Sequence, residues 1–276
     1  MPAFNYTILN EEQGSGMQGS VRKALHIPTG KLVVAKITRI DDIEMKFRFI
    51  NELTMLSRLN DCKYIVNLED SFVCNNKGIM IMERMPFDLM TLIEENKLTS
   101  LADRLRIFQL VCLAIRECHK RGIAHLDIKP ENILVSEDFA QIKICDFGNS
   151  QFVDDDGMVD SKSGTFLYCC PEYFSGRKFD GKKADIWSLG VLFHVLLTDL
   201  WPYDYSNNVE LKTAVYSGNV SAHPSITQAH LKLFSQMTRK DTEERLNIDK
   251  VCSALKRASS QQIIPQYVNR ILNKLR

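Results

Sequence analysis

Short runs in which apolar residues dominate fill the first third of the chain, and their length and composition predict β-strands. These runs cover 6–10, 21–26, 32–40, 68–74 and 78–82. A helical pattern interrupts them at 42–59, with a broad apolar face formed by Phe49, Ile50, Leu53, Leu56 and Leu59. We therefore expect the first part of the chain to be a sheet that carries one helix.

From Asp88 onward the spacing of apolar residues is mostly helical, which predicts a second, larger lobe. Its helices are expected at 101–120, 183–197, 209–218 and 228–238. The most apolar stretch, 186–201, is too short to span a bilayer and contains polar residues, so a buried core helix is the better interpretation. The pattern predicts a small sheet lobe, a hinge near 83–87 and a larger helical lobe.

The composition is typical of a folded domain without a strong overall charge. The chain has 276 residues, of which 45% are hydrophobic, so it can bury a sizeable core. Its 35 basic and 34 acidic residues give a net charge of +1, which predicts no general attraction to nucleic acid or to an anionic membrane. Eight cysteines without paired metal-ligand spacing, and a start without a signal-peptide pattern, predict free thiols in the cytosol.

A glycine-rich segment lies between two of the predicted strands. Gly14, Ser15, Gly16 and Gly19 come shortly before Val21, and such glycines let backbone amides approach a polyphosphate. A plain turn could have the same composition. The segment precedes a strand, whereas a dinucleotide-binding fingerprint opens a helix, so a Rossmann fold is not predicted.

A lysine stands inside the apolar strand that follows. Lys36 needs an anionic partner if it faces inward, and Glu52 on the predicted helix is well placed to supply it. The pair could be a structural salt bridge, or Lys36 could hold the α and β phosphates of a nucleotide.

Three further motifs decide between these interpretations. The run HLDIKPEN covers 125–132, DFG covers 146–148, and CPE covers 170–172. With the glycine segment and Lys36, this ordered set resembles the protein kinase family over about residues 5–255. The resemblance implies an α+β, bilobal fold in a single protein kinase domain over 1–276. Its small antiparallel N-lobe, with one helix, would cover about 1–83, its larger, mainly helical C-lobe 84–255, and a C-terminal amphipathic extension 256–276.

The resemblance also implies ATP and Mg²⁺ as cofactors. Phosphoryl transfer needs neutralised phosphate oxygens and an acceptor hydroxyl held in line with the phosphorus. Asp127 would orient the acceptor and accept its proton, and Lys129 would offset charge on the moving group. Asn132 and Asp146 would hold magnesium.

The nucleotide's base and ribose are expected at positions that come from the same resemblance. Adenine would lie between Val21 and Ala35 on one side and Leu134 on the other. Met82 resembles the gatekeeper, backbone groups of Glu83 and Met85 resemble the hinge contacts, and Asp88 is similar in position to residues that touch the ribose.

Lys129, two residues after Asp127, resembles the lysine found at this position in serine/threonine kinases. The HLD motif is similar to that of the calcium/calmodulin-dependent group, particularly the myosin light chain and death-associated kinases. Leu126 stands where many relatives have the arginine that binds a phosphorylated activation loop. This departure suggests activity that does not require phosphorylation of the loop, whose candidate acceptors are Ser161, Ser163 and Thr165.

We expect protein substrates with a modest preference for basic residues before the target, because Asp88 and Glu131 place acidic groups near the site. The preference is expected to be modest because Val195 stands where the most arginine-selective relatives have a glutamate. The apolar face of 263–276 is compatible with calmodulin binding, but a helix packed on the large lobe is the interpretation we favour. A pseudokinase scaffold or a small-molecule phosphotransferase are the alternatives. The complete set of motif residues argues against the first, and the segments around Glu172 and Asp185 argue against the second.

Overall fold

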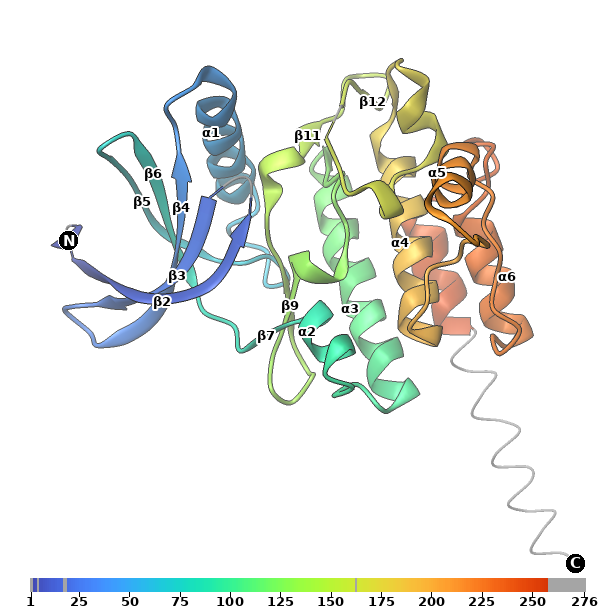
Figure 1. Ribbon diagram of the computed structural model, residues 1–276, viewed down its shortest axis with the longest axis horizontal. Helices are drawn as coiled ribbons and strands as arrows, with labels where there is room; N and C mark the ends of the chain where they lie inside the picture. Colours follow the sequence, from blue (N-terminus) through green and yellow to red (C-terminus); the bar gives the residue numbers. More distant parts are fainter. Residues whose placement is uncertain (1, 4, 17–18, 162, 258–276) are drawn as a thin grey trace, which may run out of the picture.

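The smaller lobe is a six-stranded antiparallel sheet that carries one helix (Figure 1). The computed structural model describes residues 2–3, 5–16, 19–161 and 163–257. In the order β1-β2-β3-β4-β6-β5, the strands are β1 (Pro2–Ala3), β2 (Tyr6–Gly16), β3 (Gly19–His26), β4 (Lys31–Arg39), β6 (Lys77–Glu83) and β5 (Leu68–Cys74). The expected sheet is confirmed, but β2 continues through Gly14 and Gly16, which pair with β3 instead of forming an open loop.

Helix α1 (Ile43–Arg58) packs one face against the sheet and begins at Asp42, whose side chain accepts a hydrogen bond from the amide of Met45. Phe49 lies so close to Gly78 that a Cβ there would be 2.6 Å from the ring. The predicted apolar face is wrong at Ile50, which is 51% exposed. Each residue advances a helix by about 100°, so burying Phe49 turns Ile50 away from the sheet, and Met55 joins the buried face in its place.

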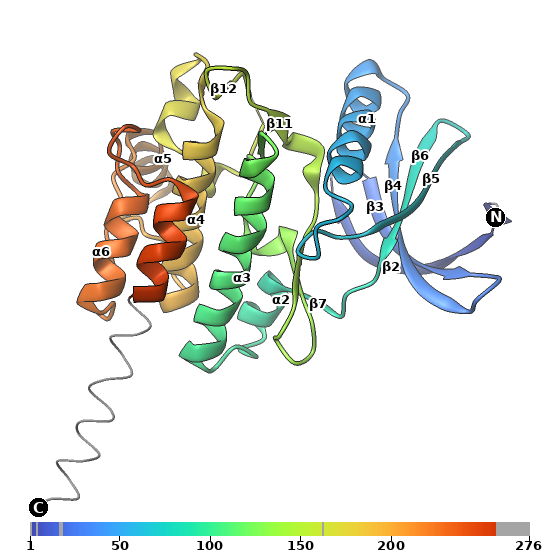
Figure 2. The same cartoon turned by 180° about the vertical axis from the view of Figure 1, so that it is seen from behind.

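The larger lobe is mainly helical (Figures 1 and 2). Its helices are α2 (Leu89–Glu94), α3 (Leu101–Lys120), α4 (Gly181–Thr198), α5 (Asn208–Ser217), α6 (Gln228–Met237) and a last helix at 248–257. The predicted core helix is confirmed as α4, in which Trp187 and most other side chains are buried. Among the described residues, no helix is both long enough and apolar enough to cross a membrane.

Seven short strands of the larger lobe hold the loops that carry the motif residues. They are β7 (Phe87–Asp88), β8 (Ile123–Ala124), β9 (Ile133–Val135), β10 (Ile142–Ile144), β11 (Gln151–Phe152), β12 (Met158–Val159) and β13 (Phe179–Asp180). The segment 125–132 connects β8 to β9, and Asp146 follows β10. Because β9 pairs with β10 and β8 with β11, the two loops are fixed at neighbouring strand ends.

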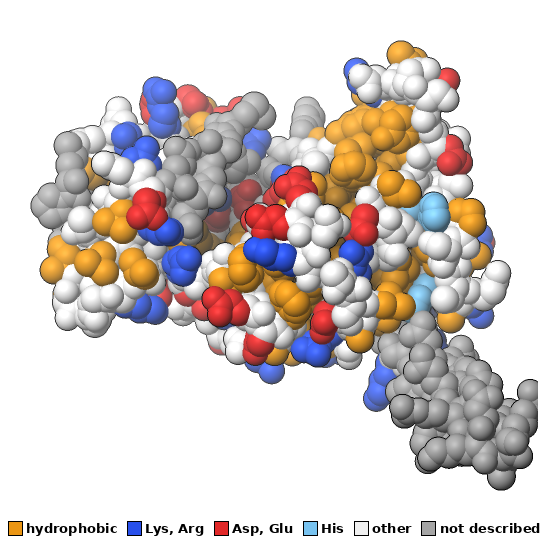
Figure 3. All heavy atoms as spheres, turned by 60° about the horizontal axis from the view of Figure 1, so that its bottom comes forward, with side chains coloured by type: hydrophobic (Ala, Val, Ile, Leu, Met, Phe, Trp, Pro, Cys, Tyr) orange, Lys and Arg blue, Asp and Glu red, His pale blue; other side chains and the backbone are white. Residues whose placement is uncertain are grey.

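The surface mixes charges of both signs, as the net charge suggests. On the face shown in Figure 3, acidic and basic side chains are interspersed. Residues 256 and 257 end the last helix, and the rest of the amphipathic extension predicted at 256–276 lies outside the described residues.

Candidate active site

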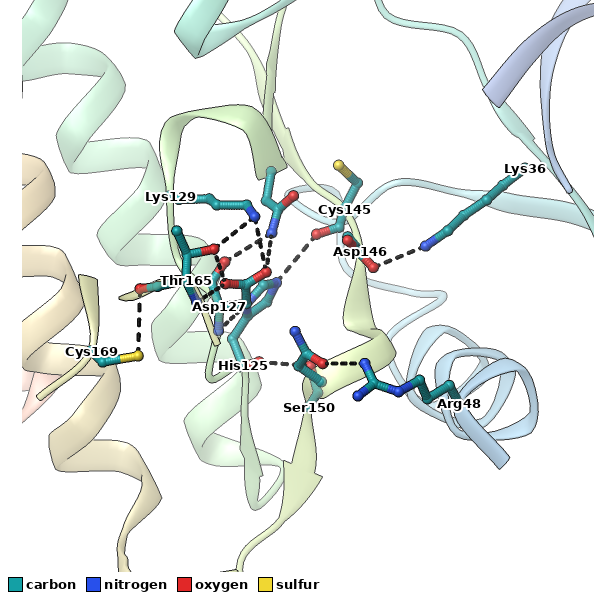
Figure 4. Close-up of polar contacts among 12 residues, drawn as sticks. Lys36, Arg48, His125, Asp127, Lys129, Cys145, Asp146, Ser150, Thr165 and Cys169 are labelled. Atoms are coloured by element: carbon teal, nitrogen blue, oxygen red, sulfur yellow. Dashed lines mark hydrogen bonds and ion pairs between the residues drawn. The ribbon is translucent and has the colours of Figure 1, made fainter. Parts of the chain in front are cut away.

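Asp127 is the centre of a compact polar group on the larger lobe (Figure 4). It is buried, and its Oδ1 accepts hydrogen bonds from the amide and the hydroxyl of Thr165 at 2.9 and 2.7 Å. Lys129 Nζ donates to the same hydroxyl at 2.8 Å and lies 3.3 Å from Asp127 Oδ2. Asn132 Nδ2 donates to the backbone carbonyl of Asp127 at 2.8 Å. An alcohol hydroxyl is thus held between a carboxylate and an ammonium group.

A buried carboxylate fixes the loop that carries Asp127. Asp185 of α4 is fully buried, and its carboxylate accepts hydrogen bonds from the backbone amides of His125 and Leu126, both at 2.8 Å. His119 of α3 lies 2.8 Å from the same carboxylate. The loop needs this support because Leu126 adopts a left-handed backbone with φ of 64°, which a residue with a side chain adopts at a cost.

The two lobes meet at Lys36, whose ammonium group binds two carboxylates. Its Nζ lies 2.7 Å from Glu52 Oε1 on α1 and 2.9 Å from Asp146 Oδ1 on the larger lobe. The pairing of Lys36 with Glu52 expected from the sequence is confirmed. α1 and the segment after β10 are therefore held together by one cation.

Burial and charge act in opposite directions on these three groups. Burial alone would lower the pKa of Lys36, but the carboxylates of Glu52 and Asp146 outweigh it and raise that pKa. Burial raises the pKa of Glu52 above its usual value even though Lys36 opposes this. For Asp146, Lys36 outweighs burial and lowers the pKa. Lys36 therefore stays positive and Asp146 negative at neutral pH, as binding of phosphate and of a metal cation requires.

The backbone around Asp146 sets the direction of its carboxylate. Asp146 has a left-handed φ of 61°, and the next residue, Phe147, is fully buried with its ring 4.8 Å from that of His125. Asn51 of α1 donates a hydrogen bond to the carbonyl of Ser150 at 2.8 Å. These contacts hold the residues after Asp146 against α1. Asp146 is left facing Lys36, as Figure 4 shows.

The glycine segment closes against the neighbouring strand. Gly19 has a φ of 144°, and a Cβ there would lie 2.0 Å from the carbonyl oxygen of Ile37. Only glycine fits this position. Gly14, Ser15 and Gly16 pair with β3 in register, which places the hairpin of β2 and β3 next to the strand that carries Lys36.

The residues expected around adenine come from both lobes. Ala35 and Met82 are buried on the neighbouring strands β4 and β6. Val21 pairs with Lys36 across β3 and β4, and Leu134 lies half-buried on β9. Contact of these side chains, and of the backbone at Met85, with a nucleotide stays a prediction.

Asp88 has a structural role that the sequence did not reveal. Its two carboxylate oxygens accept hydrogen bonds from the amide and the hydroxyl of Thr91, at 2.8 and 2.7 Å, and so cap α2. If Asp88 also binds the ribose, the same carboxylate must serve both the ribose and the helix cap. Binding of the ribose by Asp88 remains a prediction.

Two neighbouring residues fit a magnesium ion that is bound together with phosphate. Asn132 and Asp146 offer amide and carboxylate oxygens, the ligands that Mg²⁺ prefers. The amide nitrogen of Asn132 is held by Asp127, so its oxygen remains as the ligand atom. Among the described residues, no group of three or more His, Cys, Asp or Glu side chains could hold a metal ion.

An ion pair behind the hinge escaped the sequence analysis. Glu83 is the last residue of β6. Its Oε1 accepts a hydrogen bond from the amide of Asn67 at 2.6 Å and lies 2.8 Å from Lys143 Nζ on β10. The two side chains are 24% and 14% exposed. The pair therefore ties the connection between the lobes to the strand that precedes Asp146.

Replacing Lys143 with methionine should lower the free energy of unfolding by about 1 kcal/mol, because a partly buried carboxylate loses its charged donor. Lys178→Met is the matched control, since it removes the exposed pair of Lys178 with Asp154 and should cost less than about 0.5 kcal/mol. Denaturant unfolding of both variants measures the difference. Equal effects would contradict a role for Lys143 in tying the hinge.

The segment after the activation loop is anchored by an ion pair between Glu172 and Arg245. Arg245 is fully buried and binds both carboxylate oxygens of Glu172, one of them through Nη2 at 3.0 Å. Its guanidinium group also donates to the carbonyls of Arg239 and Lys183 and stacks over the ring of Trp187. This contact fixes the segment 170–175 against α4.

Comparison with known proteins assigns the chain to one family. Residues 8–255 match the family model for the protein kinase domain. The chain therefore belongs to the protein kinase family.

Its relatives are proteins named as serine/threonine kinases or as related kinases. A probable serine/threonine-protein kinase of Dictyostelium discoideum is 32% identical over 252 residues, which cover 88% of this chain and 30% of that protein. NUAK family SNF1-like kinase 1 of Mus musculus is 32% identical over 76% of this chain and 32% of its own length. Serine/threonine-protein kinase D2 of Rattus norvegicus is 29% identical over 88% of this chain and 29% of its own length. The chain thus spans about a third of the length of these relatives.

Proposed function

We propose that this protein transfers the γ-phosphate of ATP to serine and threonine hydroxyls of protein substrates. The observation that carries the proposal is the hydroxyl of Thr165, which donates to Asp127 at 2.7 Å and accepts from Lys129 at 2.8 Å. The contacts of the chain's own threonine support a site that orients an alcohol. A substrate hydroxyl would be held by the same two side chains.

Each charged residue then has one part in the transfer. Asp127 orients the substrate hydroxyl and accepts its proton as the new oxygen–phosphorus bond forms. Lys129 offsets the negative charge of the moving phosphoryl group, and Lys36 holds the α and β phosphates in the place set by Glu52. Asn132 and Asp146 would hold magnesium, which supplies neutralisation of the phosphate oxygens when it is bound.

A nucleotide-binding scaffold without turnover is the main alternative. It would need none of the hydrogen bonds that connect Asp127, Lys129 and Asn132. In this chain Asn132 donates to Asp127 and Lys129 lies 3.3 Å from the Asp127 carboxylate. Lys36 is paired with Glu52, as an active arrangement requires. This geometry favours the enzyme.

The finer expectations belong to the same proposal. Membership of the calcium/calmodulin-dependent group rests on the HLD motif. The modest basic preference rests on Asp88 and on Glu131, an exposed residue of the segment 125–132. All eight cysteines are free thiols, which supports a reducing, cytosolic location. Calmodulin binding would involve residues outside the described part of the chain.

The substrate class is tested by transfer of labelled phosphate from ATP with magnesium to peptide libraries. The proposal predicts incorporation into serine and threonine peptides, with enrichment of basic residues before the target. Transfer only to tyrosine peptides would contradict the proposed class, and transfer without any basic enrichment would contradict the preference.

We also propose that activity does not require phosphorylation of the activation segment, the part of the chain that follows Gly148 and carries Ser161, Ser163 and Thr165. Leu126 packs against the core and offers no charge to a phosphate. Arg48 of α1, labelled in Figure 4, instead donates to Asn149 Oδ1 at 3.0 Å. It also donates to Ser163 Oγ at 3.0 Å. A cation from the smaller lobe thus holds the segment through neutral side chains.

Replacing Arg48 with methionine should lower kcat/KM about tenfold, because two charged hydrogen bonds between α1 and the activation segment are lost. Arg39→Met, which removes only an exposed pair with Asp41, should leave kcat/KM unchanged. Steady-state assays of phosphatase-treated protein measure both. If phosphatase abolished the activity of the unmodified chain, the proposal of phosphorylation-independent activity would be wrong.

A further inference from the structure

A polar cavity lies on the larger lobe, away from the residues of the candidate active site. It has a volume of about 320 Å³ and is formed where three helices meet: the end of α3, the start of α4 and the start of the last helix at 248–257. Figure 2 shows these three helices side by side. None of the residues assigned to phosphate transfer lines it.

The lining carries more positive than negative charge. Four cations face the cavity, Arg116 and Lys120 from α3 and Lys182 and Lys183 from α4, against the two carboxylates of Asp180 and Asp249. Asp180 is engaged at the start of α4, where it accepts the amide of Lys183 at 2.9 Å. Lys183 is engaged by the carbonyls of Thr242 and Arg245, both at 2.6 Å. Lys120 is paired with Glu117 at 2.9 Å, so the net positive charge of the lining depends on Lys182 and Arg116.

Arg116 and Lys182 are the cations of the lining that no described carboxylate or carbonyl binds. Arg116 Nε is buried and has no hydrogen-bond partner among the described residues. No ion pair or hydrogen bond between described residues involves the side chain of Lys182. A buried guanidinium nitrogen without a partner is costly, and an external acceptor would remove that cost. This orphaned donor is the observation that indicates a ligand.

Two helix starts add to the same field. Asn247 caps the last helix by accepting the amide of Lys250 at 3.0 Å, which leaves its side-chain amide nitrogen as a donor at the rim of the cavity. The starts of this helix and of α4 bring partial positive charge to the cavity. Donors thus converge from three helices, which suits an anion with several oxygens better than a single carboxylate.

We propose that this cavity binds a phosphoryl group, with Arg116 and Lys182 as its principal ligands and Asn247 as a further donor. The group is either free inorganic phosphate or the phosphate of a phosphorylated serine or threonine in a protein. The site is independent of the proposed kinase activity, because none of its residues takes part in phosphate transfer.

Isothermal titration of the full chain with inorganic phosphate, at constant ionic strength in chloride, tests the site. The double variant Arg116→Gln/Lys182→Gln should weaken phosphate binding tenfold or more, since tenfold corresponds to about 1.4 kcal/mol for the two charged contacts. Lys232→Gln, at an exposed lysine of α6 outside the cavity, should bind phosphate as the unmodified chain does. Equal binding by the double variant and the unmodified chain, or equal weakening by Lys232→Gln, would overturn the proposal, as would the absence of phosphate binding.

Asp249→Asn is a second variant with the opposite expected sign. It removes a carboxylate from the lining, so phosphate binding should tighten about threefold. An unchanged or weaker affinity would overturn the site even if the double variant did not fold. A phosphoserine peptide titrated beside its unphosphorylated twin separates the sources: tighter binding than inorganic phosphate indicates a phosphoprotein, and equal or weaker binding indicates free phosphate.

Discussion

Replacing Asp127 with asparagine should lower kcat for phosphate transfer by about 10³-fold, while the affinity for ATP stays within about twofold. Asparagine keeps the shape of the side chain and can still accept a hydrogen bond from Thr165. It cannot take the proton of the acceptor hydroxyl, and it loses the charge that lies 3.3 Å from Lys129. The effect should therefore appear in the chemical step and not in nucleotide binding.

Asp204→Asn, at an exposed aspartate before α5, is the matched control and should leave kcat unchanged. Single-turnover transfer to a serine peptide and a separate ATP-binding titration distinguish the two quantities. A rate within tenfold of the unmodified chain for Asp127→Asn would show that another group accepts the proton.

Replacing Glu172 with glutamine should lower the free energy of unfolding by about 3 kcal/mol. The change leaves the fully buried guanidinium group of Arg245 without a counter-charge. Its hydrogen bonds to the carbonyls of Arg239 and Lys183 can persist, but neutral carbonyls do not replace a carboxylate.

The comparison for this loss is Glu244→Gln, which breaks an exposed pair with Arg239 in the same region. It should cost less than about 0.5 kcal/mol. Denaturant unfolding of both variants gives the two values. Losses of similar size would mean that Arg245 is not held by its charge and that the segment around Glu172 is anchored by packing alone.

The regular elements could be predicted where the periodic pattern was long. Helix α3 has the predicted bounds, Leu101–Lys120, because its apolar spacing runs the full length and Ser100 caps its start. The short strands of the larger lobe could not be found, because two or three residues contain no period. Ile50 was misplaced because a broad apolar stripe does not show which edge faces the core.

The candidate site was predictable only where a motif stands in the sequence. Lys36 and Glu52 were paired correctly because a buried lysine demands an anion and the helix offers one. The contacts of Arg48 with Asn149 and Ser163 join residues that are 101 and 115 positions apart in the sequence, so no local pattern predicts them. The pair of Glu83 with Lys143 is likewise a product of the tertiary fold.

The central claim, that the site turns over ATP, is tested most directly by measuring nucleotide binding and phosphopeptide formation on one phosphatase-treated sample with magnesium. The account predicts that the sample binds ATP and transfers phosphate to a serine or threonine peptide over many turnovers. Saturable ATP binding without any phosphopeptide, under conditions in which the chain is folded, would contradict it and would indicate a scaffold.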